Sequence, residues 1–297
     1  MTVLRSPTKL IRVGHSPDPD DAFMFYALAK EKIPAQGFRV EHVIEDIESL
    51  NQRAFKAELE VTAVSCHAYA YLADRYAVMR AGASVGDKYG PIIVKRQEAG
   101  SEKREKLKQS SFQLPASSLK GKRIAVPGKF TTAFLALQLY EKNFTPVFIP
   151  FDQILDAVKS GQADLGLVIH EGQITYQDHG LEKVLDLGQW WGEKFGLPLP
   201  LGIDIIRHDL GEENIRAFSR LFKESIEYAL SHRKPALEYA MQYGRGIREK
   251  DADRFVGMYV NDFTVDLGPR GEEGLRCLLN EGYEKGILPR KIELEFV

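Results

Sequence analysis

The segment Leu165-Gly166-Leu167-Val168-Ile169-His170-Glu171 is the most informative part of this sequence. An apolar run with β-branched residues is typical of a strand that is buried on both faces of a sheet. This run ends abruptly in an imidazole and a carboxylate. In an open α/β sheet, ligands bind just beyond the carboxyl ends of the strands, so His170 lies where chemistry is usually done. Because the ordinary pKa of histidine lies near neutrality, His170 is the first candidate for a catalytic group.

His170 also has a structural interpretation. An imidazole at a strand end often hydrogen-bonds to a backbone carbonyl, and Glu171 either orients that ring or caps the following helix. The local pattern leaves both interpretations open, and the general enrichment of titratable groups in clefts is what favours a catalytic role.

Outward from this strand, strand-like and helix-like segments alternate along the chain, which indicates parallel sheets covered by helices. Strands are expected at 10–13, 40–43, 61–64, 77–80, 92–95, 123–126, 147–149 and 165–169. Helices are expected at 47–57, at 132–140, after a cap at Asp20 or Asp21, after a cap at Asp152, and as an amphipathic helix over 215–230. The fold class is therefore α/β.

Two further segments suggest how the chain is divided. The stretch 97–122 is polar and charged, as expected of a surface excursion at a lobe boundary, and 197–202 is a rigid apolar segment that suits a return crossing. We therefore expect 1–96 and 203–297 to build one lobe and 97–202 to build the other. Two crossings between lobes make a hinge, and the cleft at a hinge is a usual place for a small ligand.

Composition excludes several classes of function. The chain has 297 residues, of which 44% are hydrophobic and 28% charged, as in an ordinary globular protein long enough for two lobes. A net charge of −2 gives no basic field for a nucleic-acid partner. No stretch has membrane-spanning length and 1–13 lacks the apolar core of a secretory signal, so we expect a cytoplasmic protein without a membrane partner. Cys66 and Cys277 match no metal or redox spacing, and both are expected to be buried free thiols.

Three strand-to-helix junctions offer candidate binding residues. In the first, Ser16 and Asp20 carry a hydroxyl and a carboxylate that would orient a polar substrate, although Pro and Asp are also ordinary turn and cap residues. In the second, Ser65 would cap the next helix and expose backbone N–H groups. In the third, Thr131 and Thr132 begin a helix after a glycine turn, and free N–H groups with two hydroxyls suit a carboxylate. A plain threonine cap is an equally good interpretation of that junction.

No other catalytic pattern is present. The sequence has no Walker loop, no Rossmann glycine fingerprint, no nucleophile elbow and no metal-ligand pair on a helix. We therefore expect no nucleotide, flavin or metal cofactor. A histidine that performs general acid–base catalysis is sufficient for an elimination driven by proton transfer. Trp190 and Trp191 are expected to form core or cleft wall.

Taken together, these motifs resemble those of the 1,4-dihydroxy-6-naphthoate synthase family, the late enzymes of the futalosine route to menaquinone. The resemblance runs over most of the chain, with its motifs in the family's order. The matching segments are 16–26, 45–51, 65–70, 90–91, 126–133, 169–176, 186–191, 196–202 and 259–261.

The resemblance implies a two-lobed fold of the type II periplasmic-binding-protein kind, with the ligand in a cleft between lobes. It also implies a cofactor-free carbon–carbon lyase that splits cyclic dehypoxanthinyl futalosine into 1,4-dihydroxy-6-naphthoate and a sugar-derived fragment. The family's histidine base corresponds to His170, and its substrate-binding segments correspond to Ala63-Val64-Ser65 and to Thr131-Thr132. The expected partner is thus a small carboxylate substrate, and the oligomeric state is left open.

The first loop departs from the family pattern. That loop usually reads Ser-Pro-Cys-Pro-Asn-Asp-Thr, whereas this chain has Asp18, Asp20 and Ala22 in place of Cys, Asn and Thr. A carboxylate in place of an amide at Asp20 removes a hydrogen-bond donor and adds charge beside an anionic substrate. Two alternatives therefore stay open, namely a sister enzyme such as chorismate dehydratase and a solute-binding protein for a small carboxylate.

Overall fold

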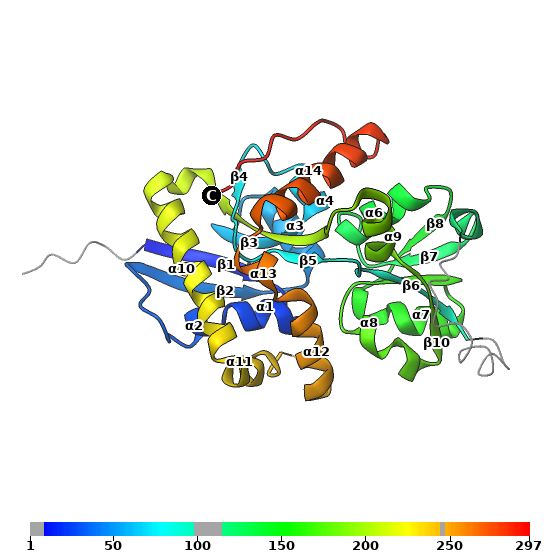
Figure 1. Ribbon diagram of the computed structural model, residues 1–297, viewed down its shortest axis with the longest axis horizontal. Coiled ribbons are helices and arrows are strands. Elements are labelled where there is room, and N and C mark those ends of the chain that lie inside the picture. Colours follow the sequence, from blue (N-terminus) through cyan, green and yellow to red (C-terminus); the bar gives the residue numbers. More distant parts are fainter. Residues whose placement is uncertain (1–8, 98–114, 244–246) are drawn as a thin grey trace, which may run out of the picture.

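Two lobes lie side by side in the computed structural model, each built on its own sheet (Figure 1). The structure describes residues 9–97, 115–243 and 247–297. Most of the polar stretch 97–122, and residues 1–8 of the amino-terminal segment, therefore lie outside the described residues. Within the described chain, no helix combines the length and the apolar character that crossing a membrane requires.

The first sheet contains strands from both ends of the chain. Its strands are β1 (Lys9–His15), β2 (Phe38–Ile44), β3 (Val61–Ser65), β4 (Tyr76–Val78), β5 (Ser84–Gly86) and β11 (Leu199–Arg207). The order is β2-β1-β3-β11-β4, and β5 pairs with the first half of β11. Strand β1 is parallel to β2 and β3, and β11 runs antiparallel to β3. The carboxyl ends of β1 and β3 therefore lie at the same edge of the sheet.

Helices cover this first sheet on both faces (Figure 1). They are α1 (Pro19–Met24), α2 (Tyr26–Ala29), α3 (Ile47–Phe55), α4 (Cys66–Tyr69), α10 (Glu212–Ser231), α11 (Arg233–Ala240), α12 (Glu249–Tyr259), α13 (Asp262–Val265) and α14 (Gly268–Glu284). The amphipathic helix expected over 215–230 is confirmed as α10, which buries Phe218, Phe222 and Ile226. Phe222 stacks on Phe25 with 4.6 Å between ring centroids, so α10 is anchored on the amino-terminal helices.

The second sheet comes from the middle of the chain. Its strands are β6 (Ile92–Arg96), β7 (Arg123–Val126), β8 (Thr145–Phe148), β9 (Leu165–Val168) and β10 (Leu181–Asp186), in the order β10-β6-β9-β7-β8. Its helices are α6 (Thr132–Tyr140), α7 (Ile154–Ser160), α8 (Gly172–Thr175) and α9 (Leu187–Phe195). Strand β9, the run with which the sequence analysis began, is the central strand and is fully buried. Helix α7 ends at Gly161, which takes the left-handed conformation with φ of 81°.

The chain changes sheets earlier than the sequence suggested. It leaves the first sheet between Gly86 and Ile92 and returns to it between Asp186 and Leu199. Both changes precede the lobe limits expected after 96 and after 202. The reason is pairing: Ile92 bonds in register with Val168 of β9, and Leu199 already pairs with Gly86 of β5. The exact lobe limits stay a prediction.

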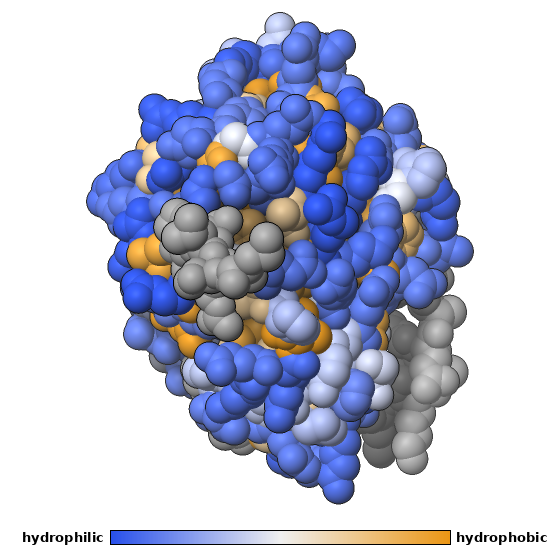
Figure 2. All heavy atoms as spheres, turned by 90° about the vertical axis from the view of Figure 1, so that its left-hand side faces the viewer, coloured by the Kyte–Doolittle hydropathy of each residue, from blue (hydrophilic) through white to orange (hydrophobic). Residues whose placement is uncertain are grey.

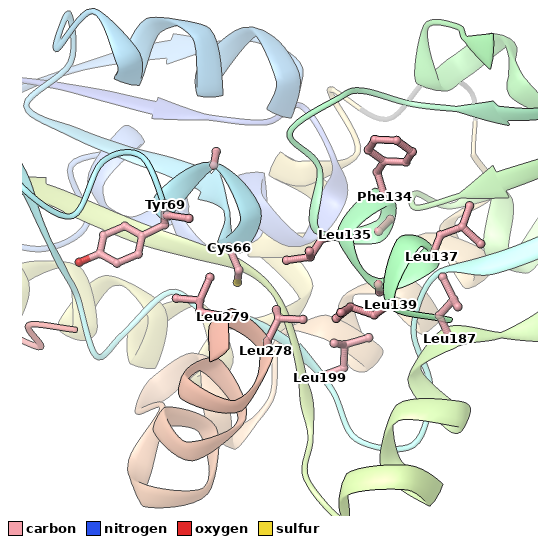
Figure 3. Close-up of a cluster of buried hydrophobic side chains, with 14 of the residues drawn as sticks. Cys66, Tyr69, Phe134, Leu135, Leu137, Leu139, Leu187, Leu199, Leu278 and Leu279 are labelled. Atoms are coloured by element: carbon pink, nitrogen blue, oxygen red, sulfur yellow. The ribbon is translucent and has the colours of Figure 1, made fainter. Parts of the chain in front are cut away.

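A large apolar cluster joins the two lobes beside the cleft (Figure 3). Leu135 and Leu139 of α6 in the second lobe face Leu278 of α14 and Cys66 of α4 in the first. Trp191 is fully buried in the same cluster, so the core interpretation of the tryptophan pair holds for this residue. The two thiols that were expected to be buried differ: Cys66 is buried, whereas Cys277 is free but only partly buried and packs against the same cluster.

The outer face of the first lobe carries hydrophilic residues with scattered hydrophobic ones among them (Figure 2). Singly exposed apolar side chains of this kind are normal for a folded protein. The described features that point to function therefore lie between the lobes rather than on this face.

Candidate functional site

A cavity lies where the loop after β1 and the end of β3 face the start of α6. It holds about 650 Å³ of space between protein atoms, part of it open to solvent. Its lining residues are Ser16, Asp18, Asp20, Asp21, Ile47, Ala63, Ser65, Gly82, Ser84, Pro91, Thr131, Thr132, Ala133, Ile169, Leu201, Gly202, Ile203 and Asp204. The structure thus brings together all the expected site residues except Val64 and His170.

The loop after β1 is shaped by its own side chains. The Asp21 carboxyl accepts the Ser16 N–H at 2.9 Å, and the Asp18 N–H donates to Ser16 Oγ at 3.1 Å. The cap expected at Asp20 or Asp21 is wrong: Asp18 occupies the N-cap position, and its side chain makes no capping bond. Pro19 sets this boundary, because proline favours the first turn of a helix. Asp20 and Asp21 are consequently turned toward the cavity wall.

Burial controls the charge of this loop. It raises the pKa of Asp20 well above the ordinary value, and the charges of Asp21 and Asp18 raise it further. Burial also raises the pKa of Asp21 to about 6. A protonated carboxyl offers one donor and one acceptor. Asp20 in that form has hydrogen-bonding capacity close to that of an amide, and the extra negative charge expected from the sequence is suppressed.

The end of β3 contributes two side chains to the cavity. Residues along a strand point alternately to opposite faces, so Ala63 and Ser65 line the cavity while Val64 is fully buried in the apolar cluster. Ser65 lies at the N-cap position of α4 but makes no capping bond with its side chain. Instead Asn51 of α3 holds it, accepting the Ser65 N–H at 3.0 Å and donating to Ser65 Oγ at 3.3 Å.

The start of α6 faces Ser65 across the cavity. Thr131 caps the helix as expected: its Oγ1 accepts the Phe134 N–H at 3.2 Å and donates to the Gly128 carbonyl at 3.0 Å. The Thr132 hydroxyl donates to the Leu201 carbonyl. Because the first N–H groups of a helix have no acceptor within it, the donors left for a ligand are the backbone N–H groups of 132 and 133. The sequence analysis did not name Ala133 as a binding residue. Its position two residues after the cap residue Thr131 could have indicated a free N–H group.

Asp204 is a second residue that sequence reasoning missed. Strand β11 pairs antiparallel with β3 so that Asp204 lies opposite Ala63, and Gly202 lies opposite Ser65. Directly opposed residues share one face of a sheet, and all of them line the cavity. The available signal was a single carboxyl within the apolar run 203–206. Burial and the charge of Asp21 raise the pKa of Asp204 well above its ordinary value.

His170 lies beside this cavity rather than in its wall. Its neighbour Ile169 lines the cavity, whereas His170 lines a separate hollow with Glu171 and Arg248. The His170 side chain is 7% exposed. The Gly172 N–H donates to Nδ1 at 2.9 Å, and Nε2 lies 2.8 Å from the Phe151 carbonyl. Because an N–H group only donates, the neutral ring carries its proton on Nε2 in this arrangement.

Charged and polar neighbours act on the pKa of this imidazole. Burial alone lowers the pKa of His170, but the hydrogen bond and charge of Glu171, the charge of Asp18 and the Phe151 carbonyl outweigh it, so the pKa lies above its ordinary value. Nδ1 lies 3.5 Å from Oε2 of Glu171. Gly172 leaves room for the ring, since a Cβ there would lie 2.8 Å from Cε1 of His170. Asp18 lines the cavity, and its charge also raises the pKa of His170, so this residue connects the imidazole electrostatically with the cavity.

Contacts between the lobes close the site at two rims. At one rim, Glu48 of α3 accepts the Phe130 N–H at 3.3 Å, and a Cβ on Gly128 would lie 2.5 Å from Glu48 Oε2. At the other rim, the hydroxyl of Tyr259 on α12 donates to Oε1 of Gln173 on α8 at 2.9 Å. The lobes therefore contact each other at two polar positions in addition to the apolar cluster.

Comparison with known sequences gives a consistent result. A family model described as menaquinone biosynthesis matches residues 11–284. The 1,4-dihydroxy-6-naphthoate synthase of Thermus thermophilus is 39% identical over 277 residues, which cover 93% of this chain and 95% of that protein. The protein of the same name from Streptomyces coelicolor is 33% identical over 285 residues, 94% of this chain and 95% of that one. Both relatives are named as synthases, which is an enzyme role.

Comparison with solved structures supports the fold. A crystal structure of a protein from Archaeoglobus fulgidus is 48% identical, with a TM-score of 0.85 over 94% of this chain and 98% of that one. A Candida albicans protein with the generic periplasmic binding protein fold has a TM-score of 0.61 at 14% identity, over 96% of this chain and 97% of that one. This second likeness concerns the fold alone, and it confirms the two-lobed α/β architecture expected from the sequence.

Proposed function

The chain belongs to the menaquinone biosynthesis family, and from this premise we propose that it is a carbon–carbon lyase of the 1,4-dihydroxy-6-naphthoate synthase type. Its substrate is cyclic dehypoxanthinyl futalosine, which it splits into 1,4-dihydroxy-6-naphthoate and a sugar-derived fragment. The cytoplasmic location expected from the sequence is part of the same proposal. The observation that carries it is the cavity in which Ser16, Ser65 and the start of α6 converge.

The start of α6 supports binding of the substrate carboxylate. The backbone N–H groups of Thr132 and Ala133 provide unpaired donors at the positive end of the helix dipole. The Thr131 and Thr132 hydroxyls hold the local backbone in place through their bonds to the Gly128 and Leu201 carbonyls. We therefore assign carboxylate binding to the N–H groups and a positioning role to the two hydroxyls.

His170 is the proposed general base, and this role requires a different hydrogen-bond arrangement from the one described. A base needs a free ring nitrogen. If the ring proton moves to Nδ1, the Gly172 N–H must give up its bond to that nitrogen, and Oε2 of Glu171, 3.5 Å away, becomes the acceptor for the Nδ1–H group. Nε2 then gives up its bond to the Phe151 carbonyl and is free to take a proton from the substrate. Closure of the lobes on the substrate excludes water from this step.

The test supplies cyclic dehypoxanthinyl futalosine to the purified protein and to the His170→Asn and Glu171→Gln variants. Formation of 1,4-dihydroxy-6-naphthoate is followed by chromatography. We expect the wild type to turn over, His170→Asn to lose roughly 10²–10⁴-fold in kcat, and Glu171→Gln to lose less. Substrate affinity should change less than kcat in either variant, because the proposed role of His170 is to take a proton in the reaction rather than to hold the bound substrate.

A matched control is His179→Asn, which changes a histidine that lines the same hollow but lies at the far end of the segment after α8. It should keep the wild-type rate. Full activity in His170→Asn would remove the proposed base. Tight binding of the substrate by the wild type with no product would instead indicate a binding protein.

A further inference from the structure

The proposed reaction leaves one feature of the cavity unexplained, the carboxyl group of Asp204. This residue is 0% exposed, and within the described chain neither of its oxygens has a hydrogen-bond partner. A buried polar group without a partner destabilises a protein, so native structures rarely contain one. Its position in the cavity wall means that a ligand can supply the missing partner.

The surroundings hold this carboxyl in a fixed position. Gly82 lies behind it with φ of 98°, and a Cβ there would lie 2.2 Å from Asp204 Oδ2 and 2.5 Å from the Phe222 ring. Ala63 lies directly opposite Asp204 on the neighbouring strand. The backbone of Gly82 lies behind the carboxyl group and the methyl group of Ala63 lies beside it. The cavity is therefore the direction from which a hydrogen-bond partner can come.

A second carboxyl and a hydroxyl belong to the same wall. Asp20 and Ser84 line the cavity with Asp204, and Ser84 Oγ donates to Asp20 Oδ2 at 3.3 Å. A metal ion does not account for the cluster, since the described residues include no group of three or more His, Cys, Asp or Glu placed to hold one. No Lys or Arg is among the lining residues either, so the group has no protein counter-ion in this wall.

We propose that Asp204, Asp20 and Ser84 form a subsite for neighbouring hydroxyl groups of a sugar-like portion of the ligand. This inference rests on the proposed function, because it orients that substrate: its sugar-derived part lies toward Asp204, and its carboxylate lies toward the start of α6. Strand β11 separates the two kinds of group: Thr132 at the start of α6 bonds to the Leu201 carbonyl, whereas Asp204 lies three residues further along the strand, opposite Ala63.

Hydroxyl groups fit this subsite better than an ammonium group. Burial raises the pKa values of Asp20 and Asp204, which favours their protonated forms. A protonated carboxyl both donates and accepts, as a hydroxyl does, so the two kinds of group pair with each other. An ammonium group only donates and requires an ionised partner.

The test compares Asp204→Leu with Asp204→Asn, using two probes in calorimetry or protein-observed NMR. Methyl β-D-ribofuranoside carries the hydroxyl groups alone, and 1,4-dihydroxy-6-naphthoate carries the carboxylate without a sugar. We expect Asp204→Leu to weaken binding of the ribofuranoside roughly tenfold or more, the loss of one or two hydrogen bonds. Asp204→Asn should stay within about threefold of wild type, because an amide reproduces the donor and acceptor of a protonated carboxyl. Binding of the naphthoate should be unchanged in both variants.

Ser84→Ala provides a second variant on a partly exposed residue, in case the leucine variant does not fold, and it should also weaken ribofuranoside binding alone. Asp164→Asn is the matched control, since Asp164 pairs with Arg123 outside the cavity. An equal loss for both probes, or no loss in Asp204→Leu and Ser84→Ala, would overturn the subsite. An equal loss in Asp204→Leu and Asp204→Asn would overturn it in favour of a cation site. The ribofuranoside arm needs no turnover, so it distinguishes failure of the subsite from failure of the proposed reaction.

Discussion

Among single residues, the cavity contains carboxyl groups whose pKa values are raised by burial. Asp20, Asp21 and Asp204 come from two distant segments, yet they share one wall. Each has a raised pKa in which burial is the largest cause. This permits an acidic ligand to bind near acidic residues, because a protonated carboxyl does not repel it.

The same shifts predict how stability depends on pH. A carboxyl whose pKa is raised on folding binds its proton more tightly in the native state, so stability falls as pH rises from the unfolded value near 4 through the folded value. For Asp21 this interval ends at about 6, and for Asp20 and Asp204 the direction is the same. Buried His15, His42 and His67 act in the opposite direction, because burial lowers their pKa values to about 3, 4 and 4, so their contribution rises with pH up to the unfolded value near 6.5. We therefore expect the three carboxyls to make a contribution to the melting temperature of the ligand-free protein that falls as the pH rises.

Asp204→Asn should flatten that decline and, at pH 8, raise the free energy of unfolding by roughly 1–3 kcal/mol. Calorimetry at several pH values measures both effects. Asp164→Asn again serves as the control, because Arg123 lowers the pKa of Asp164 and its contribution has the opposite sign. Identical pH slopes in wild type and Asp204→Asn would contradict the account.

The candidate residues that could be predicted from the sequence lie at junctions between strands and helices. Ser16, Ser65 and the two threonines were found because a strand end or a helix start is a recognisable pattern. Asp204 was not found, because its place depends on which residue of β3 it faces, and that register comes from pairing between segments far apart in sequence. His170 was placed correctly after its strand, but the turn that follows directs its ring into the neighbouring hollow.

At the scale of elements, one loop requires a glycine for contact between lobes. The loop before α6 approaches the Glu48 side chain of α3 so closely that a Cβ on Gly128 would have to displace it. We expect Gly128→Ala to displace Glu48 from the Phe130 N–H and to lower the free energy of unfolding by roughly 1–3 kcal/mol. Urea denaturation measures this effect.

The control is Gly257→Ala on α12, where a Cβ meets only Arg233 at 3.5 Å. This helical site should gain about 0.5–1 kcal/mol from alanine. Removing the Glu48 side chain should also relieve the strain, so the Gly128→Ala effect should shrink sharply in a Glu48→Ala background. If the changes in the free energy of unfolding caused by the two substitutions are additive, the contact between residue 128 and Glu48 does not cause the destabilisation.

Most elements followed from periodicity, and the exceptions have a physical reason. The buried strand β9 and the amphipathic helix α10 were visible as an apolar run and as a repeat at threes and fours. Strand β5 was not expected, because it is only Ser84–Gly86 and exists through its pairing with β11. Pairing of this kind also decided where the chain changes sheets.

In the molecule as a whole, the lobes are joined by an apolar cluster and by separate polar contacts. Helix α6 contributes to the cavity and to the cluster: its first residues line the cavity, and its later residues pack into the apolar cluster with α4 and α14. Burial of apolar surface makes this cluster the rigid side of the joint. Movement of the lobes then pivots about α6 and acts at the rim contacts of Glu48 and Tyr259.

The chain order of the two sheets has a consequence for synthesis. All strands of the second sheet lie between Ile92 and Asp186, whereas the first sheet needs β11, Leu199–Arg207, as the partner of both β3 and β4. On the ribosome, β1, β2 and β3 can pair with one another, but β3 and β4 must wait for that late segment to complete their pairing, while the middle of the chain already has all its pairing partners. Domains generally fold as units as they emerge, so the second lobe should form first although it begins later. In refolding, pulsed hydrogen exchange should show earlier protection in β6–β10 than in β3, and the reverse order would refute this folding sequence.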